Sequence, residues 1–512
     1  MDIFFKEHNI MIKIIKIIIL LQLGWAQQIQ ESTPFSKNHK INDSIHTISL
    51  PKVDHEVLLE EDFYRIEGTP YRYGFKHEVN LNPENSGTWQ NTLDGGRIWQ
   101  IKLFSEGAYS ISIEYENFFI PLGGQLFVMT PDYEMIHGAY THINNHYTHQ
   151  FSTPHLIGDT AIIEYYEPKG TTEQFSMTIS EIIHDYKDIM NFYNNNRDWE
   201  CGVNVICEDE EQYQGPINSV AFLDMGGFIC SGAMVNNVRQ DLTPYFLTAW
   251  HCIDGDNPST FRFYFNKIAS SCENTWGSAG EYAYSSDLVA DSDGISHSSG
   301  SDSPGGDWAL LLIDDEIEQD WEVFYAGWDV TSNYPIITCG VHHPGGTPKK
   351  INYDDDTAYG AWWDNASHGL THWQVNWDDG GSEGGSSGSP IFNERSQIVG
   401  VLTGGAGECG QGYPDLYGKL ELAWNWEMGT NRRMIDWLDP DYTGTLVIEG
   451  TYVEVTGILG DINSDDAVNI LDIIQLSNMI LNGEFLIDAD INDDGTLNIL
   501  DIIALSNIIL NN

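Results

Sequence analysis

Hydrophobic and polar residues alternate along much of the chain, in runs that predict β-strands. Two clear runs are GAYSISIEYENFFI at 107–120 and GDTAIIEYYE at 158–167. Alternation with a period of two places apolar side chains on one face of a sheet and polar side chains on the other. Between 201 and 446 the runs are short and separated by Gly, Asn and Asp, and only 432–438 favours a short helix. The pattern predicts a mainly β protein built from barrels or sandwiches.

The pattern changes in the last fifty-odd residues, where a loop and an apolar helix occur twice. DINSDDAVNILDIIQLSNMILN at 461–482 recurs as DINDDGTLNILDIIALSNIILN at 490–511. Calcium takes six to eight oxygen ligands, so a short loop must supply an oxygen at nearly every second residue. Both copies do so at loop positions 1, 3, 5, 9 and 12, with Asp461, Asn463, Asp465, Asn469, Asp472, then Asp490, Asn492, Asp494, Asn498 and Asp501. This spacing predicts two Ca²⁺ loops, against the alternative of two acidic amphipathic helices.

Composition and charge limit the partners of the chain. The chain has 512 residues, which is enough for two to four domains. Of these residues 41% are hydrophobic, so a sizeable core can be buried. With 76 acidic and 23 basic residues, the formal net charge is −53. Such a charge repels phosphates, so nucleic acid is not expected as a partner. It fits a secreted protein that handles calcium or basic substrates.

The N-terminus predicts export. Lys13 and Lys16 precede a short apolar run at 17–23, and Ala26 offers the small residue that a signal peptidase prefers. The alternative is a membrane anchor, but the run is short for a span of about 20 residues. We therefore expect a signal peptide at 1–26 and no membrane span after its removal. The protein is then extracellular, free or associated with a cell surface.

The glycine- and serine-rich stretch GGSEGGSSGSP at 380–390 is either a flexible linker or a tight loop. It runs directly into IFNERSQIVGVLTGG at 391–405, which predicts a strand, a turn and a second strand. A linker does not usually feed straight into a buried strand pair. The context therefore favours a loop that holds one serine in a special geometry.

Two further segments supply partners for a serine. His251 ends the run YFLTAWHC, and Asp307 precedes the apolar strand in GGDWALLLI. Alone, each is as typical of a structural histidine or a turn aspartate. A serine nucleophile, however, needs a neutral imidazole base, and that base needs an oriented acceptor on its other nitrogen. A glycine-rich turn can also aim backbone N–H groups at a developing oxyanion. Together these residues predict acyl-enzyme hydrolysis without a catalytic cofactor.

These motifs resemble those of chymotrypsin-like serine proteases and, within them, the bacterial lysyl endopeptidases. TAWHC, GDWALL and GSSGSP match the histidine, aspartate and nucleophile motifs. The resemblance implies a chymotrypsin-like double β-barrel at 199–448. It selects Ser387 as the nucleophile, and not Ser382, Ser386 or Ser389. It also implies an oxyanion hole made by the N–H groups of Gly385 and Ser387.

The resemblance to lysyl endopeptidases covers nearly all of 201–446, including CGVNVIC, CSGAMVNN, YAGWD, HHPGGTPKK and DWLDP. All seven cysteines lie between 201 and 409, and exported chains commonly form disulfides. The family pattern implies three disulfides and one buried free thiol, with the pairs Cys201–Cys409, Cys207–Cys272 and Cys230–Cys252, and Cys339 unpaired.

The same resemblance implies a specificity pocket. Asp415, in YPDLYG, matches the acidic pocket residue, and a buried carboxylate favours a cationic residue before the cleaved bond. The alternative is a turn aspartate. Trp362 matches a family tryptophan near the catalytic histidine. Thr403 stands where lysyl-specific members have a histidine, so cleavage after arginine remains an alternative to cleavage after lysine.

The segment 27–198 precedes the first cysteine and is expected to be a β-rich propeptide domain, as family members carry. Arg197, after the run Asn194 to Asn196, offers a site for self-cleavage, and Lys187 is the alternative. A further alternative is that the segment stays attached as a permanent domain.

Residues 459–512, after a linker at 449–458, resemble a type I dockerin. The resemblance implies a small α-helical Ca²⁺-binding tail and a cohesin-like partner. At loop positions 10 and 11, dockerins often carry small polar residues. This chain has Ile470-Leu471 and Ile499-Leu500 there instead.

The leading hypothesis is a secreted serine endopeptidase that cuts proteins or peptides after lysine, with arginine as the alternative. Its competitor is a non-catalytic adhesion or scaffold protein that keeps a protease fold. A serine esterase of the α/β-hydrolase type is excluded, because it needs a G-x-S-x-G elbow and the order Ser, Asp, His.

Overall fold

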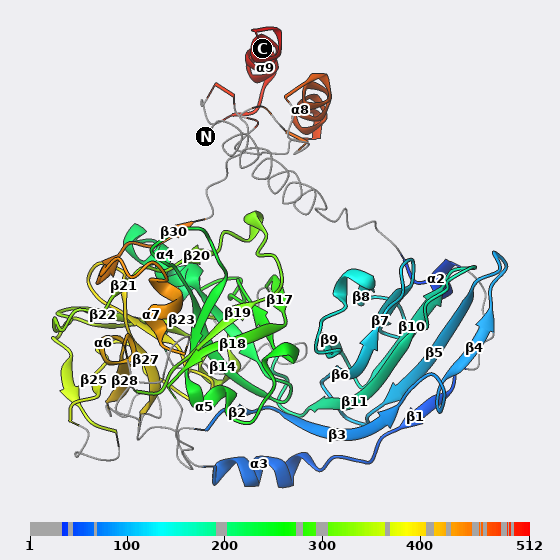
Figure 1. Cartoon of the computed structure of the whole chain (residues 1–512), viewed down its shortest axis with the longest axis horizontal. Coiled ribbons are helices and arrows are strands. Elements are labelled where there is room, and N and C mark those ends of the chain that lie inside the picture. Colours follow the sequence, from blue (N-terminus) through cyan, green and yellow to red (C-terminus); the bar gives the residue numbers. More distant parts are fainter. Residues whose placement is uncertain are drawn as a thin grey trace, which may run out of the picture. The chain divides into compact units, whose positions relative to one another are not determined.

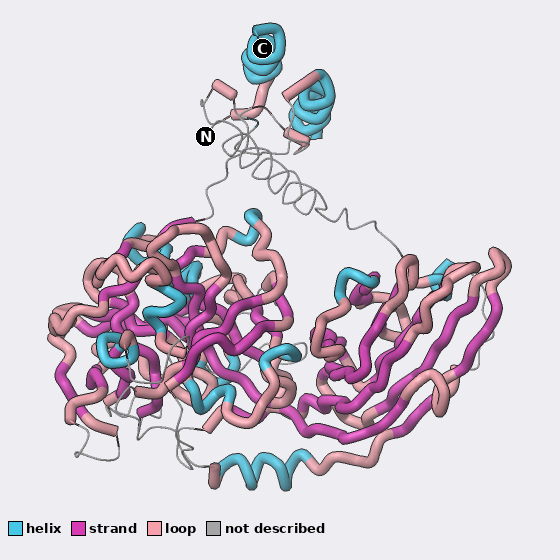
Figure 2. The backbone as a smooth tube through the Cα atoms, in the orientation of Figure 1, coloured by secondary structure: helices cyan, strands magenta, loops and turns pink. Residues whose placement is uncertain are grey.

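A computed structural model describes residues 33–38, 45–65, 69–190, 202–272, 280–292, 306–363, 369–405, 414–425 and 432–452 and, in the tail, 460, 462–463, 468–482, 489, 491–492 and 496–511. The chain forms two compact units. One runs up to Ile317 and continues as Val323–Gly450, and the other joins Glu318–Glu322 to Thr451–Asn512. Strands dominate the first unit and helices the tail (Figures 1 and 2). The prediction of a mainly β fold is confirmed.

The N-terminal part of the first unit consists of two sheets that share one apolar core. The predicted strands at 107–120 and 158–167 are β6 and β10 (Figure 1). Helix α3 (His55–Phe63) lies between β1 and the other strands of these sheets in the chain. One sheet contains β1 (Thr47–Ser49), β4 (Thr88–Asn91), β5 (Arg97–Phe104), β7 (Gln125–Met129), β8 (Ile136–Tyr140) and β10 (Thr160–Glu167). The other contains β3 (Gly74–Leu81), β6 (Ser110–Phe119), β9 (Phe151–Ile157) and β11 (Ser176–Asp185).

The remainder of the first unit is the predicted double barrel, built from an eight-stranded and a ten-stranded sheet. The eight-stranded sheet contains β2 (Tyr71–Arg72), β13 (Val220–Asp224), β14 (Phe228–Val235), β15 (Tyr245–Thr248), β16 (Arg262–Tyr264), β17 (Tyr282–Tyr284), β18 (Ser286–Asp291) and β19 (Ala309–Ile313). The ten-stranded sheet contains β12 (Val203–Asn204), β21 (Trp328–Asp329), β22 (Thr338–His342), β23 (Lys350–Asp354), β24 (Tyr359–Ala361), β25 (His372–Val375), β26 (Pro390–Phe392), β27 (Ile398–Gly405), β28 (Asp415–Lys419) and β29 (Val447–Ile448). The helix expected at 432–438 is α7 (Met434–Leu438).

A polar seam joins the N-terminal sheets to the first barrel. The carboxylate of Asp224, at the end of β13, accepts hydrogen bonds from Tyr73 Oη at 2.7 Å and Arg262 Nε at 2.9 Å. His155 of β9 lies 3.1 Å from the same carboxylate. All four side chains are buried, and the ion pair with Arg262 outweighs the burial penalty and holds the pKa of Asp224 below its usual range. Because buried polar groups are costly without hydrogen-bond partners, and Tyr73 and His155 come from the N-terminal part, this seam ties the two parts together.

The tail forms its own small core. Helices α8 (Ile470–Asn482) and α9 (Ile499–Asn511) pack through apolar side chains that include Leu476, Met479 and Leu505. Each helix starts at position 10 of its predicted Ca²⁺ loop, so the last residues of the loop belong to the helix. No helix within the described part of the chain is long and apolar enough to cross a membrane. The predicted signal peptide lies outside the described residues.

Candidate active site

His251 and Asp307 lie together because two neighbouring strands carry them. His251 lies in the short helix α5 (Trp250–Ile253) directly after β15, and Asp307 lies two residues before β19. The two strands pair antiparallel, with Thr248 opposite Ala309. Asp307 Oδ2 is 2.6 Å from His251 Nδ1, and Oδ1 accepts the His251 N–H at 3.0 Å. Asp307 is fully buried, so its carboxylate can hold the imidazole with Nε2 directed away from it.

The stretch at 380–390 is a tight loop and not a linker. The Ser387 carbonyl accepts a hydrogen bond from Ser231 N–H of β14 at 2.8 Å. Gly388, at φ +81°, lies so close to the strand before His251 that a Cβ atom would be 2.2 Å from Thr248 Oγ1. Only glycine permits this conformation and this approach. The loop is thereby fixed against the strand that leads to His251, and Ser387 Oγ forms no hydrogen bond to any described residue.

The backbone at Ser387 and two residues before it offers N–H groups that could bind an oxyanion. The N–H groups of Ser386, Gly388 and Ser389 donate to Glu383, Leu402 and Ser386 carbonyls, respectively. Within the described ranges, the N–H groups of Gly385 and Ser387 donate to no protein atom. Gly385 adopts φ +98°, which turns the chain at this point. Free N–H groups beside a serine are the arrangement that stabilises an oxyanion.

Two of the other serines of the loop are engaged elsewhere, and the third is inaccessible. Ser386 Oγ bonds to His342 Nδ1 at 2.7 Å, and Ser382 Oγ donates to Asp415 Oδ1 at 2.6 Å. Ser389 Oγ has no hydrogen-bond partner among the described residues either, but Ser389 is fully buried. Ser387 thus differs from these three serines in combining a hydroxyl without a fixed partner with an exposed fraction of 8%.

Asp415 begins β28 and is almost fully buried. In addition to Ser382, it accepts a hydrogen bond from Trp377 Nε1 at 2.6 Å. Its strand neighbour Gly405 is close enough that a Cβ atom would be 1.9 Å from the carboxylate. The carboxylate is therefore held in one orientation between β27, β28 and the segment that leads into the serine loop.

Trp362 is half-exposed, whereas the adjacent Trp363 lies against the strand after Thr403. A Cβ atom at Gly404 would be 2.7 Å from the Trp363 ring, whose centroid is 6.1 Å from that of His372. His372 Nε2 bonds to Thr403 Oγ1 at 3.1 Å, and burial lowers the pKa of His372 to about 4. The neutral His372 therefore lies beside Thr403, the position at which lysyl-specific members of the family have a histidine.

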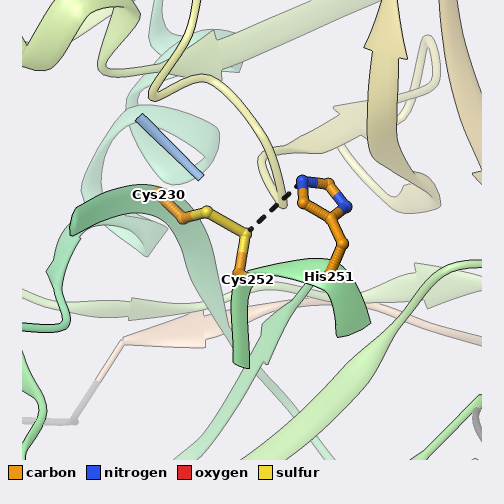
Figure 3. A group of neighbouring side chains, drawn as sticks. All are labelled: Cys230, His251 and Cys252. Carbon is orange, nitrogen blue, oxygen red and sulfur yellow. Dashed lines mark hydrogen bonds between the residues drawn. A yellow bond between two sulfur atoms is a disulfide. The ribbon is translucent and has the colours of Figure 1, made fainter. Parts of the chain in front are cut away.

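Figure 3 shows His251 beside the disulfide between Cys230 and Cys252. Cys230 lies on β14 next to Ser231, so this bond connects that strand to the helix of His251. The sulfur atoms are bonded to each other and cannot serve as thiolate metal ligands. The structure also contains the disulfide Cys207–Cys272, while Cys201 and Cys409 lie outside the described residues. Cys339 is free and buried, and burial raises its pKa to about 12.

Comparisons with known proteins agree with the motifs. Residues 196–418 match the family model of the lysyl endopeptidase C-terminal domain, and residues 459–510 match the dockerin type I domain. The lysyl endopeptidase of Pseudomonas aeruginosa is 27% identical over 228 residues, which are 41% of this chain and 46% of that protein. The chain thus spans about half the length of the curated relative that it matches.

Similar solved structures include a Glu endopeptidase in complex with MPD, at 19% identity and a TM-score of 0.29 over 44% of this chain and 92% of that chain. Human heparin binding protein matches at 17% identity and a TM-score of 0.30 over 42% and 91%. The chain carries a lysyl endopeptidase-like domain and a dockerin-like tail. The resemblance that the motifs indicated is confirmed.

In the lysyl endopeptidase-like domain, the sequence motifs did not reveal the residues that hold the site in place. Ser231 follows Cys230 in CSGAMVNN without any special spacing, yet its Oγ donates to the Gly385 carbonyl at 2.9 Å. Trp377 and Ser382 bind Asp415 from a segment nearly forty residues away in the chain. Such contacts depend on the assembled barrels and have no local signal.

A second group with the same residue types lies in the polar seam. Ser110 Oγ is 2.8 Å from His155 Nδ1, and His155 Nε2 is 3.1 Å from Asp224. Ser110 is fully buried, and its hydroxyl donates to Asp185 at 2.8 Å. Because no substrate can reach this serine and its proton is already committed, the group is structural.

The dockerin-like loops have matching geometry at their ends. Asp472 is fully buried, and its carboxylate accepts the N–H groups of Ile462 and Asn469 at 2.8 and 2.7 Å. In the second copy, Asp501 accepts Asn498 N–H at 2.8 Å. These contacts fold each loop around its last carboxylate. Asp461, Asp465, Asp490 and Asp494 lie outside the described residues.

We expect Gly388→Ala to destabilise the protein by about 2–4 kcal/mol, because the new methyl group adds a clash to a strained φ. Gly107→Ala is the matched control, since Gly107 also has a positive φ, at +85°, but nothing lies within 4 Å of its Cβ position. That control should lose only about 1 kcal/mol. Chemical denaturation measures both values, and equal losses would contradict the tight packing of the serine loop.

Proposed function

We propose that the chain is a secreted serine endopeptidase that cleaves peptide bonds after lysine. The observation that carries the proposal is the pair His251 and Asp307 beside a loop with two unused N–H groups. The matches to a lysyl endopeptidase domain support the same reaction class. The competing scaffold function would leave this arrangement without a use.

In the proposed mechanism, Ser387 Oγ attacks the carbonyl carbon of the cleaved bond and transfers its proton to His251 Nε2. Asp307 orients the imidazole through Nδ1 and stabilises the imidazolium that forms. The N–H groups of Gly385 and Ser387 donate to the oxyanion. His251 then gives the proton to the leaving amine. A water molecule, deprotonated by the same imidazole, releases the acyl group from Ser387.

Asp415 is the proposed partner of the cationic side chain before the cleaved bond. Its buried carboxylate is oriented by Trp377 Nε1 and Ser382 Oγ, one on each oxygen, and its negative charge would attract a substrate ammonium group. A buried carboxylate also disfavours neutral side chains, because these would leave the charge unpaired. Lysine is proposed from the family match, and arginine is the alternative.

Processing after Arg197 is also proposed, and the alternative site is disfavoured. Lys187 is 8% exposed, and its Nζ lies 2.7 Å from Asp62 Oδ2. A protease cannot bind such a side chain without first unfolding its surroundings. Arg197 itself lies outside the described residues.

The tail is proposed to bind two Ca²⁺ ions and, through its helices, a cohesin-like partner. This assignment rests on the dockerin type I match and on the two buried carboxylates of Asp472 and Asp501. Secretion or attachment to a cell surface is proposed from the N-terminal pattern and from both family matches.

Ser387→Ala should lower peptidase activity by several orders of magnitude without unfolding the protein, because the nucleophile is lost and the loop is kept. Ser386→Ala is the control, since its hydroxyl bonds to His342. Hydrolysis of a lysyl peptide, with a melting curve for each variant, measures the effect. If Ser386→Ala removed activity and Ser387→Ala did not, the nucleophile would be assigned wrongly.

Asp415→Asn should reduce kcat/KM for lysyl and arginyl peptides by about tenfold or more, with little loss for neutral residues at that position, because one charge pair is removed. Asp378→Asn is the matched control, since Asp378 adjoins Trp377 but is exposed. A peptide library read for the residue before the cut measures the change. An equal loss for every residue would indicate a structural role for Asp415.

Replacing Asp472 and Asp501 together by alanine should abolish calcium uptake by the tail, because each loop loses its twelfth ligand. Calorimetric titration of the full chain measures the uptake, and lysyl peptidase activity should persist. Unchanged uptake of two ions per chain would contradict the assignment of these loops.

A further inference from the structure

The N-terminal sheets reach the active site through one short strand. β2 pairs antiparallel with β14, with Tyr71 opposite Ile229 and Arg72 opposite Phe228. Two further bonds, from the N–H groups of Tyr73 and Gly74 to the Gly227 carbonyl, extend the contact. β14 therefore has an added strand at the end that leads into Cys230 and Ser231.

This end of β14 adjoins the serine loop. Ile229 is followed, after one residue, by Ser231, whose N–H binds the Ser387 carbonyl. The Ile229 side chain lies against Gly385, where a Cβ atom would be 3.1 Å from its Cδ1. Whatever pairs with β14 at Ile229 therefore lies directly beside the proposed oxyanion site.

The side chains of the N-terminal part close over the same loop. A Cβ atom at Gly384 would lie 2.7 Å from Tyr71 Cδ2. On the neighbouring segment, a Cβ atom at Gly346 would lie 2.1 Å from Ile189 Cδ1. Tyr71 and Ile189 thus occupy the surface that Gly384 and Gly346 leave open.

β2 itself pairs with β14 of the first barrel. The proposed lysine pocket, at Asp415, belongs to the second barrel, where β28 pairs with β27. The serine loop contacts both, since Ser382 binds Asp415 and Ser387 binds Ser231 of β14. A substrate with its lysine against Asp415 and its cleaved bond at Ser387 would therefore continue toward β14. An extended peptide commonly binds such a site by adding a strand to an exposed edge, which is what β2 already does.

A partly buried clamp holds β2 in place. Asp62, on α3, accepts Arg72 Nε at 2.7 Å and pairs with Lys187 Nζ at 2.7 Å. Lys187 Nζ also lies 4.1 Å from the centre of the Tyr71 ring. Burial alone would raise the pKa of Asp62, but hydrogen bonds from Lys187 and Tyr186 outweigh it and hold this pKa below its usual value. The clamp is therefore charged at neutral pH.

We propose that β2 is an intramolecular inhibitor that fills the leaving-group side of the active site and leaves the lysine pocket open. The proposal rests on the proposed endopeptidase function. Through β2, the N-terminal domain occupies the edge of β14, and the Asp62 clamp holds β2 there. Short substrates that end at the cleaved bond can then reach Ser387 in the uncut chain, whereas longer peptides have to displace β2.

The experiment uses the full chain with Arg197→Gln, so that it stays uncut at the proposed site. Two substrates share the same acyl part ending in lysine. One carries a nitroanilide directly after the lysine, and the other carries four further residues. We expect the ratio of kcat/KM for the long substrate over the short one to rise about tenfold when Asp62→Ala is added, because a buried ion pair is lost.

Glu61→Gln is the matched control. Glu61 also bonds to Arg72 Nη2, at 3.0 Å, but its side chain is 56% exposed, so the ratio should stay within about twofold. If Asp62→Ala fails to fold, Tyr71→Ala removes the ring over Gly384 and should raise the same ratio.

An identical ratio in all folded variants would overturn the proposal, and it would leave the endopeptidase function standing. Relief of inhibition equally for both substrates would also overturn it, because the inhibitor would then cover the lysine pocket. If neither substrate is hydrolysed and a phosphonate reagent does not label Ser387 in any of these chains, the endopeptidase function itself fails, and the inhibitor proposal falls with it.

Discussion

The hydrogen bond from Ser231 N–H to the Ser387 carbonyl is the contact on which the active-site geometry depends. It joins a strand of the first barrel to a loop of the second. Ser231 Oγ also accepts the His343 N–H and donates to the Gly385 carbonyl. Ser231 therefore holds the loop at both Gly385 and Ser387. The neighbouring disulfide ties this strand to the helix of His251. A shift between the barrels would therefore separate the serine from its base.

Local patterns predicted much of the fold because they report local physics. The alternating runs became β6 and β10, and the apolar repeats became α8 and α9. The helices begin inside the predicted Ca²⁺ loops, for a reason that the sequence also contains. Asn469 and Asn498 accept the N–H groups of Leu471 and Leu500, so each loop residue caps the helix that follows.

The candidate site could be predicted in its residue types and their order, but not in the contacts that hold it. His251, Asp307 and Ser387 stand in motifs, whereas Ser231 and Trp377 act through partners far along the chain. Sequence also cannot separate two groups of identical chemistry. Ser110, His155 and Asp224 repeat the types Ser, His and Asp, and only their complete burial and the bond from Ser110 to Asp185 distinguish them from a reactive site.

The seam around Asp224 has a consequence for how such proteins can be assembled from modules. Asp224 and Arg262 belong to the first barrel, while Tyr73 and His155 belong to the N-terminal part, and none of the four is exposed to water that could replace a missing partner. A gene fusion that exchanged one half for that of a distant relative would remove hydrogen-bond partners from this buried ion pair. The N-terminal part and the protease barrels should therefore be inherited together. The tail, with a separate apolar core, is free to be shuffled between unrelated enzymes.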